Sequence, residues 1–135
     1  MRLRLSAALI LALAGAVSIG CNGITDPSQN TVESFAGTVQ PAGARAHWFS
    51  ASKTGEIAIK VLTLTPASSS FIGVQWVQGA NDQTCSSSAL QNNQFAGANT
   101  TAISGQIVSG PYCVIMYDPG TFTQPTNYSI TVSHP

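Results

Sequence analysis

The sequence carries few side chains that could perform acid, base or nucleophilic chemistry. Five acidic residues and two histidines, His47 and His134, are the whole supply of carboxylates and imidazoles. His47 stands beside Trp48 in a strand-like run without a nucleophile motif, which is typical of a packed histidine. The Gly-x-Ser-x-Gly, His-Glu-x-x-His and P-loop patterns are absent. Because catalysis needs such groups held close together, we expect a non-enzymatic protein, with a small hydrolase that uses His47 as the minor alternative.

The N-terminal residues predict export. Residues 1–20 have two early arginines, an uncharged apolar stretch and then small residues, the pattern of a signal peptide. Ile19-Gly20-Cys21 resembles the bacterial lipobox, although Ser18 stands where that pattern usually has Leu. The resemblance implies that Cys21 is lipidated and, through Asn22, that the outer membrane is the site of anchoring. The polar residues that follow Cys21, with little apolar content, predict that residues 21–33 form a flexible tether between the lipid and the domain. An ordinary cleaved signal peptide with an incidental cysteine is the alternative.

The remaining two cysteines predict a disulfide. With Cys21 carrying lipid, Cys85 and Cys113 form an even pair in an oxidising compartment. A zinc site is not expected, because two distant thiols and two histidines do not have the short ligand spacings of zinc sites. A Cys85–Cys113 bond would bring Asp82 near Asp118, where two loop carboxylates could hold calcium. The alternative is that Asp82 is solvated and Asp118 only begins the turn Asp118-Pro119-Gly120. We predict no metal and no cofactor.

Aromatic rings beside amides form a candidate ligand site. Trp76 follows Gln75 and is close to Gln78 and Asn81. Flat rings next to neutral hydrogen-bonding side chains favour a neutral glycan as the ligand, so these four residues are the predicted binding residues. A lone tryptophan on an alternating strand more often fills the core, and this is the alternative for both tryptophans of the chain. Other candidate aromatic residues are Trp48, Tyr117 and Phe122.

The composition limits the classes of partner. Charged residues make up only 7% of the chain, against roughly 25% in ordinary soluble domains. Beyond residue 21 the chain has three basic and five acidic residues, with no basic cluster. Nucleic-acid binding needs clustered Lys and Arg, so a nucleic-acid partner is not expected. Ser, Thr, Asn and Gln must supply the polar surface instead.

The pattern from residue 34 onward is that of short strands. Ile57, Ile59 and Val61 share one face, whereas Leu62 and Leu64 fall in the opposite phase. A bulge near Val61 would restore the inward phase, and the alternative is that both faces are buried. Residues 112–117 are apolar throughout, which predicts a central strand. Residues 79–93 are polar and irregular and predict a long loop. We therefore expect residues 34–135 to form an all-β domain, an antiparallel, jelly-roll-like β-sandwich of seven to eight strands with one disulfide.

Several of these strands resemble bacterial pre-peptidase C-terminal domains. The motifs are Phe35-x-Gly37-x-Val39, His47-Trp48-Phe49-x-Ala51, Thr54-Gly55-x-Ile57-x-Ile59, Gly110-Pro111-Tyr112-Cys113-Val114 and Tyr128-x-Ile130-x-Val132. The resemblance covers roughly residues 34–133 and implies a non-catalytic accessory sandwich with binding or secretion roles. The chain departs from the family in having a cysteine pair and no attached enzyme domain, and the family's calcium ligands are not carried over.

These observations predict a non-catalytic, envelope-associated binding or interaction module. Its expected partners are the membrane, through the N-terminal lipid, and either a polysaccharide or an envelope protein. The alternative is a structural subunit of a cell-envelope or extracellular assembly joined through strand edges, since few charged residues guard those edges.

Overall fold

The structure is a computed structural model that describes residues 26–69 and 71–135. The expected signal peptide, Cys21 and the start of the tether lie outside the described residues. A single 3-10 turn, η1 (Pro27–Gln29), precedes the strands β1 (Thr31–Val39), β2 (Ala44–Ala51), β3 (Gly55–Thr65), β4 (Ile72–Gly79), β5 (Cys85–Ala96), β6 (Thr100–Ile107), β7 (Gly110–Tyr117) and β8 (Thr126–His134). Within the described ranges, no helix has the length and apolar character needed to span a bilayer.

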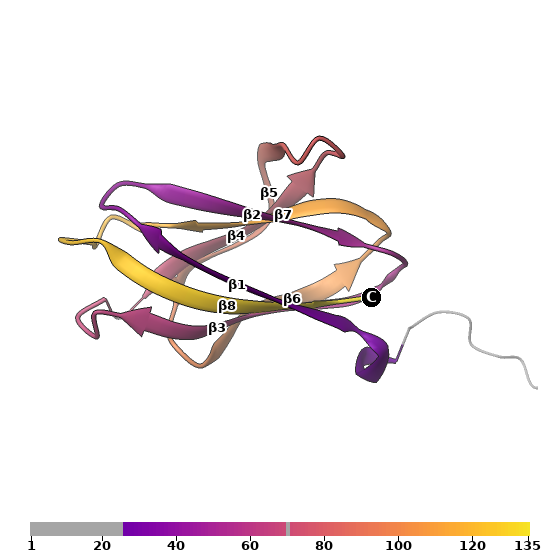
Figure 1. Cartoon of the computed structure of the whole chain (residues 1–135), viewed down its shortest axis with the longest axis horizontal. Coiled ribbons are helices and arrows are strands. Elements are labelled where there is room, and N and C mark those ends of the chain that lie inside the picture. Colours follow the sequence, from indigo (N-terminus) through magenta and orange to yellow (C-terminus); the bar gives the residue numbers. More distant parts are fainter. Residues whose placement is uncertain (1–25, 70) are drawn as a thin grey trace, which may run out of the picture.

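The eight strands form two packed layers (Figure 1). One sheet has the order β1-β8-β3-β6 and the other has the order β2-β7-β4-β5, and every strand pair is antiparallel. This confirms the predicted all-β sandwich. The apolar strand β7 is central in its sheet, as its sequence predicts, because both of its edges are paired.

Alternating side chains from the two sheets fill the core. On β3, Ile57, Ile59 and Val61 are buried, and the strand is bulged between Val61 and Thr63, as predicted. The bulge brings Leu64 back against the core. On the facing sheet, the buried residues of β4 and β7 follow the same alternation and include Val74, Trp76, Tyr112, Val114 and Met116.

Strand β5 is the main difference from the sequence prediction, which has a loop over residues 79–93. β5 is an edge strand that pairs only with β4, and most of its residues are exposed. An edge strand does not need one apolar face, so a run of Ser, Asn and Gln can pair without the alternation that marks central strands. The domain also begins earlier than predicted, because β1 starts at Thr31 rather than at residue 34.

The strand directions define two ends of the sandwich. Thr31 pairs with His134, so the chain enters and leaves the fold at the same end, here called the proximal end (Figure 1). β1 then runs to the opposite end, here called the distal end, where β2 starts at Ala44 and pairs with Tyr117. Ile72 of β4 also lies at the distal end, because Gly73 is the partner of Tyr117 across β4 and β7.

Candidate functional site

His47 lies on β2, and its side chain packs against β1 and β8 of the facing sheet. Its Nε2 is 2.7 Å from the hydroxyl of Tyr128, and its ring stacks on Phe35 with centroids 4.8 Å apart. Burial, and secondarily the positive charge of Arg45, lower the pKa of His47. Burial also raises the pKa of Tyr128 to about 12, although Arg45 opposes the rise. These shifts favour the neutral imidazole and the protonated phenol, and the contact joins β2 of one sheet to β8 of the other.

His134 contacts Glu33 and Phe49 at the proximal end. Its Nε2 is 2.8 Å from Oε1 of Glu33, and its ring packs at 5.0 Å from that of Phe49. The side chain is buried, and the contact joins the end of β8 to the start of β1. Both histidines are thus engaged in contacts between strands.

Asp82 and Asp118 do not meet. Asp118 follows β7 at the distal end, whereas Asp82 follows β4 at the proximal end, so the sequence hypothesis of a shared calcium site is wrong. Desolvation raises the pKa of Asp118, but hydrogen bonds from the backbone N–H groups of Ala42, Phe122, Thr121 and Gly120 outweigh it and hold the pKa below its ordinary value. The Asp118 carboxylate therefore stabilises the turn that follows β7. Across the described residues, no three His, Cys, Asp or Glu side chains gather as metal ligands would.

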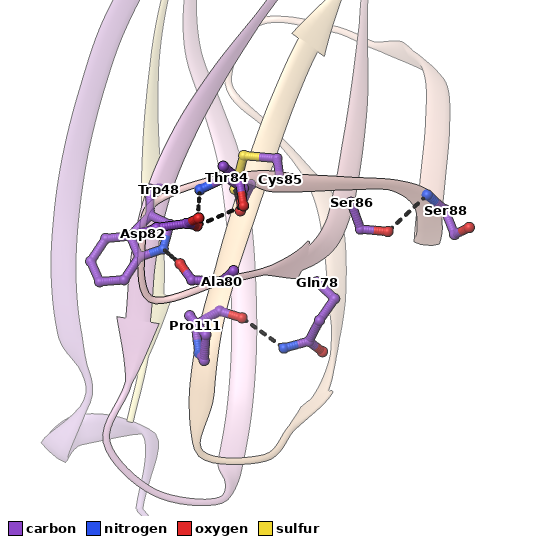
Figure 2. The surroundings of a disulfide bond; sticks show 10 residues. Trp48, Gln78, Ala80, Asp82, Thr84, Cys85, Ser86, Ser88 and Pro111 are labelled. Carbon is purple, nitrogen blue, oxygen red and sulfur yellow. Dashed lines mark hydrogen bonds between the residues drawn. A yellow bond between two sulfur atoms is a disulfide. The ribbon is translucent and has the colours of Figure 1, made fainter.

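The Asp82 turn and Trp48 pack together beside the disulfide (Figure 2). Asp82 Oδ1 accepts hydrogen bonds from the N–H and hydroxyl of Thr84, which lower the pKa of Asp82. The indole N–H of Trp48 donates to the carbonyl of Ala80 at 2.9 Å. Trp48 is half-buried on the outer face of its sheet, not in the core, and it covers this turn.

The disulfide predicted from the cysteine count is present. Cys85 and Cys113 are bonded with their Cα atoms 5.9 Å apart. Cys113 lies on the central strand β7 and Cys85 begins the edge strand β5. The bond therefore fastens the start of an edge strand to the middle of its own sheet.

The four predicted glycan-binding residues are not brought together. Trp76 is 5% exposed and packs at 5.5 Å from the ring of Tyr112, so it has no free face for a sugar. Gln75 faces outward on the opposite side of β4, because neighbouring residues of a strand point to opposite faces. The Gln78 amide donates to the carbonyl of Pro111, and Asn81 lies in the turn after β4. Phe122 is also buried.

Tyr117 instead forms a flat platform on the outer face at the distal end. A Cβ built on Gly73 would lie 2.3 Å from Cζ and 2.5 Å from both Cε atoms of the Tyr117 ring. Three nearly equal distances mean that this Cβ would strike the face of the ring, so the ring lies flat across the backbone at Gly73. The hydroxyl donates to Oδ1 of Asn92 on β5 at 2.7 Å, which fixes the ring in place.

Two exposed phenylalanines lie at the same distal end of this sheet. Phe71 and Phe95 are 47% and 63% exposed and pack edge to face with ring centroids 6.1 Å apart. They directly precede Ile72 and Ala96, a buried pair across β4 and β5, so alternation places both phenylalanines toward the outer face. We name this surface the distal aromatic patch and define it by Phe71, Gln75, Asn92, Phe95 and Tyr117.

The sequence gives only a partial signal for the distal aromatic patch. Tyr117 and Gln75 are among the sequence candidates, but Phe71, Asn92 and Phe95 are not. Phe95 and Asn92 belong to the edge strand that the sequence presents as a loop. The one local signal is Gly73, a glycine inside a strand, which often marks a position where another group approaches the backbone closely.

A hollow of about 370 Å³ lies on the other sheet at the proximal end. Asn30 lines it and donates through Nδ2 to the carbonyl of Glu56 and to Oγ of Ser133. The hollow also contains Ser104 and Gln106 but no aromatic ring. Its polar groups serve first to attach the start of β1 to β3 and β8.

The comparisons with known proteins agree on the fold. No protein-family model and no curated protein matches the chain. Membership of the pre-peptidase C-terminal family therefore stays a prediction. The chain is similar to the crystal structure of the Yersinia pseudotuberculosis-derived mitogen, with 11% identity over 78% of this chain and 87% of that chain and a TM-score of 0.54.

The chain is also similar to PliG of Aeromonas hydrophila, a periplasmic lysozyme inhibitor of g-type lysozyme. The identity is 13%, over 82% of this chain and 91% of that chain, and the TM-score is 0.52. At these identities the similarity concerns the sandwich fold, which these chains share over most of their length.

Proposed function

We propose that the chain is a non-catalytic binding module of the bacterial cell envelope and that it binds through the distal aromatic patch. The observation that carries the proposal is the exposure of Phe71 and Phe95 on the outer face at the distal end, where the Tyr117 ring also lies. Exposed aromatic residues that gather in one place are characteristic of binding surfaces. The histidines and the carboxylates discussed above are held in structural contacts, which favours binding over catalysis.

The fold comparison supports the same class of function. One similar protein is named for its mitogenic effect and the other for the inhibition of a lysozyme. The inhibitor is periplasmic, which agrees with export of this chain.

We further propose that Cys21 carries a lipid at the outer membrane. The proximal end then faces the lipid, because β1 begins there. The distal aromatic patch lies at the other end of the sandwich and would point away from the membrane surface. An anchor at Cys21 and a binding surface at the distal end are therefore geometrically compatible.

Sedimentation with the insoluble envelope fraction of the source organism tests the binding function. Residues 26–135 contain all eight strands and the disulfide and serve as the soluble form. We expect wild type and Val32→Ser to sediment with the fraction and Phe95→Ser to stay in solution. Val32 is the matched control, because it is 61% exposed but lies on β1 in the other sheet. Equal sedimentation of all three proteins, or none for wild type, would contradict the proposal.

A structural subunit joined through strand edges is the second candidate. β1 pairs with β8 over nine residues and β2 pairs with β7 over eight, both without a register shift. Regular edges of this kind can accept a further strand. The edge strand β5 is less suited, because its pairing with β4 is interrupted three times. Light scattering over a concentration series tests this candidate, and a constant monomer mass argues against it.

A further inference from the structure

We propose that the ligand of the distal aromatic patch is a neutral polysaccharide, an inference that rests on the proposed binding function. The patch combines a flat ring, two further rings and amide side chains. These are the groups that recognise a sugar ring, which has apolar C–H faces and a rim of hydroxyl groups. Of the patch residues, only Gln75 belongs to the four predicted binding residues, and Tyr117 is one of the other aromatic candidates of the sequence.

The orientation of Tyr117 supplies the stacking surface. One face of its ring lies against the backbone at Gly73, so the other face is directed away from the sheet. A ring parallel to the sheet offers a flat area on which a sugar can lie. The hydrogen bond to Asn92 holds the ring in this orientation before any ligand arrives. Such preorganisation lowers the entropic cost of binding.

The amides beside the rings supply hydrogen bonds. Oδ1 of Asn92 accepts from Tyr117, which orients the amide and directs its NH₂ donors away from that bond. Gln75 is the cross-strand partner of Asn92 and faces outward between β5 and β7. Amide groups donate and accept, so this pair can bind the hydroxyl groups of a sugar without a net charge.

The absence of charge on this face selects a neutral polymer. No residue of β4, β5 or β7 is charged, and the outward positions of β2 hold Ala44, Ala46, Trp48 and Ser50. An anionic polymer would need basic side chains near the patch. The patch also lacks the complementary charges that give many protein complexes their specificity and their rate of association. Asp118 directly follows Tyr117, and its carboxylate already accepts four backbone hydrogen bonds.

Affinity electrophoresis in gels that contain one polysaccharide each tests the inference. The neutral probes are dextran, laminarin and galactomannan, and the charged control is alginate. We expect at least one neutral polymer to retard residues 26–135 and alginate to have no effect. Tyr117→Ala and Phe95→Ala should each weaken the retardation about tenfold, because each removes one ring from the sugar contact. Val32→Ala should bind like wild type.

The variants must be folded for the result to count. Phe95 is exposed, so its substitution is the safer of the two, and Tyr117→Phe keeps the ring while it removes the bond to Asn92. We expect Tyr117→Phe to bind more weakly than wild type and more strongly than Tyr117→Ala. No retardation in any neutral gel, equal retardation of wild type and Phe95→Ala, or a preference for alginate would overturn the inference.

The envelope sedimentation separates the two proposals. If Phe95→Ser abolishes sedimentation and periodate treatment of the fraction abolishes it for wild type, both proposals hold. If protease treatment abolishes it and periodate does not, the ligand is a protein, and the glycan inference fails while the binding function stands. If Phe95→Ser sediments like wild type, both proposals fail.

Discussion

The aromatic ring of Tyr117 lies flat over the backbone of Gly73, its neighbour across β4 and β7. The ring can occupy this place only because residue 73 has no side chain. A glycine in the interior of a strand normally weakens the strand. Its flexible backbone loses more conformational entropy on folding than that of other residues, and it has no side chain to pack. Here the ring itself covers the gap, and a tyrosine on the outer surface is held parallel to the sheet.

Gly73→Ala should displace this ring. The added Cβ would lie 2.3 Å from Cζ of Tyr117, well inside contact distance, so the ring must rotate away and lose its bond to Asn92. We expect a loss of about 1–3 kcal/mol of unfolding free energy, measured by urea denaturation. Without the Tyr117 ring there is no clash. Gly73→Ala should therefore lower the unfolding free energy much less in the Tyr117→Ala background than in wild type. Additive effects of the two substitutions would show that the ring does not occupy this position.

Trp76→Ala should destabilise the protein rather than abolish binding alone. The side chain is 5% exposed, and its removal leaves a large cavity beside Tyr112, at a cost of about 3–5 kcal/mol. Trp76→Phe should cost less, because it keeps a ring and removes Nε1, which is buried without a partner. Thermal unfolding followed by circular dichroism gives both values. A stable Trp76→Ala variant that fails to bind sugars would return Trp76 to the ligand site.

Reduction of the disulfide should lower the unfolding free energy. The bond closes a loop between residues 28 apart in the sequence, and the chain-entropy model gives about 3.5 kcal/mol for such a loop. Urea unfolding with and without reductant measures the loss. Cys85→Ala/Cys113→Ala is the control, and reductant should not change its midpoint. An unchanged wild-type midpoint in reductant would show that the cross-link contributes little to stability.

Stability should fall when His47 is protonated. Burial and the Arg45 charge lower its pKa in the folded chain, so the unfolded chain binds the proton first, near pH 6.5. The unfolding free energy therefore decreases as the pH falls below about 6.5 and continues to do so until the pH is below the folded pKa. Urea midpoints at pH 7.5 and 5.5 should differ more in wild type than in His47→Gln. The same pH dependence in both proteins would assign the effect to another group.

Asp118→Ala should loosen the turn between β7 and β8. Its carboxylate accepts from the N–H groups of Gly120, Thr121 and Phe122 through Oδ1 and from that of Ala42 through Oδ2. Asp118 is half-buried at the surface, so we expect a modest loss of about 1–2 kcal/mol, read from urea unfolding at pH 7. Because the folded pKa is depressed, this stabilisation is lost only as the pH falls below about 3.8. Asp26→Ala, in the turn before β1, should have a smaller effect.

The fold was predictable where a buried strand face produces a regular spacing of apolar residues in the sequence. Ile57, Ile59 and Val61 repeat with the period of a strand because one face of β3 is covered, and the mismatch at Leu62 reveals the bulge. The disulfide followed from counting cysteines. β5 was not predictable, because an edge strand with two exposed faces has no such periodicity.

The candidate site was less predictable than the fold. A tryptophan between amides looks the same in sequence whether its ring faces the core or solvent, and Trp76 faces the core. The flat position of Tyr117 depends on a glycine that is distant in sequence and adjacent only through strand pairing. Such a contact arises from topology and cannot be read from spacing.

The Cys85–Cys113 bond also bears on the fate of the protein after proteolysis. The exposed turn at Ala98 and Asn99 lies between the two cysteines and separates Phe95 from Tyr117 along the chain. A protease that cuts this turn would leave two fragments that remain covalently joined. Each fragment would carry part of the aromatic surface, and the sulfur bridge would keep the parts in one molecule. A nicked form would thus run as one band without reductant and as two bands with it.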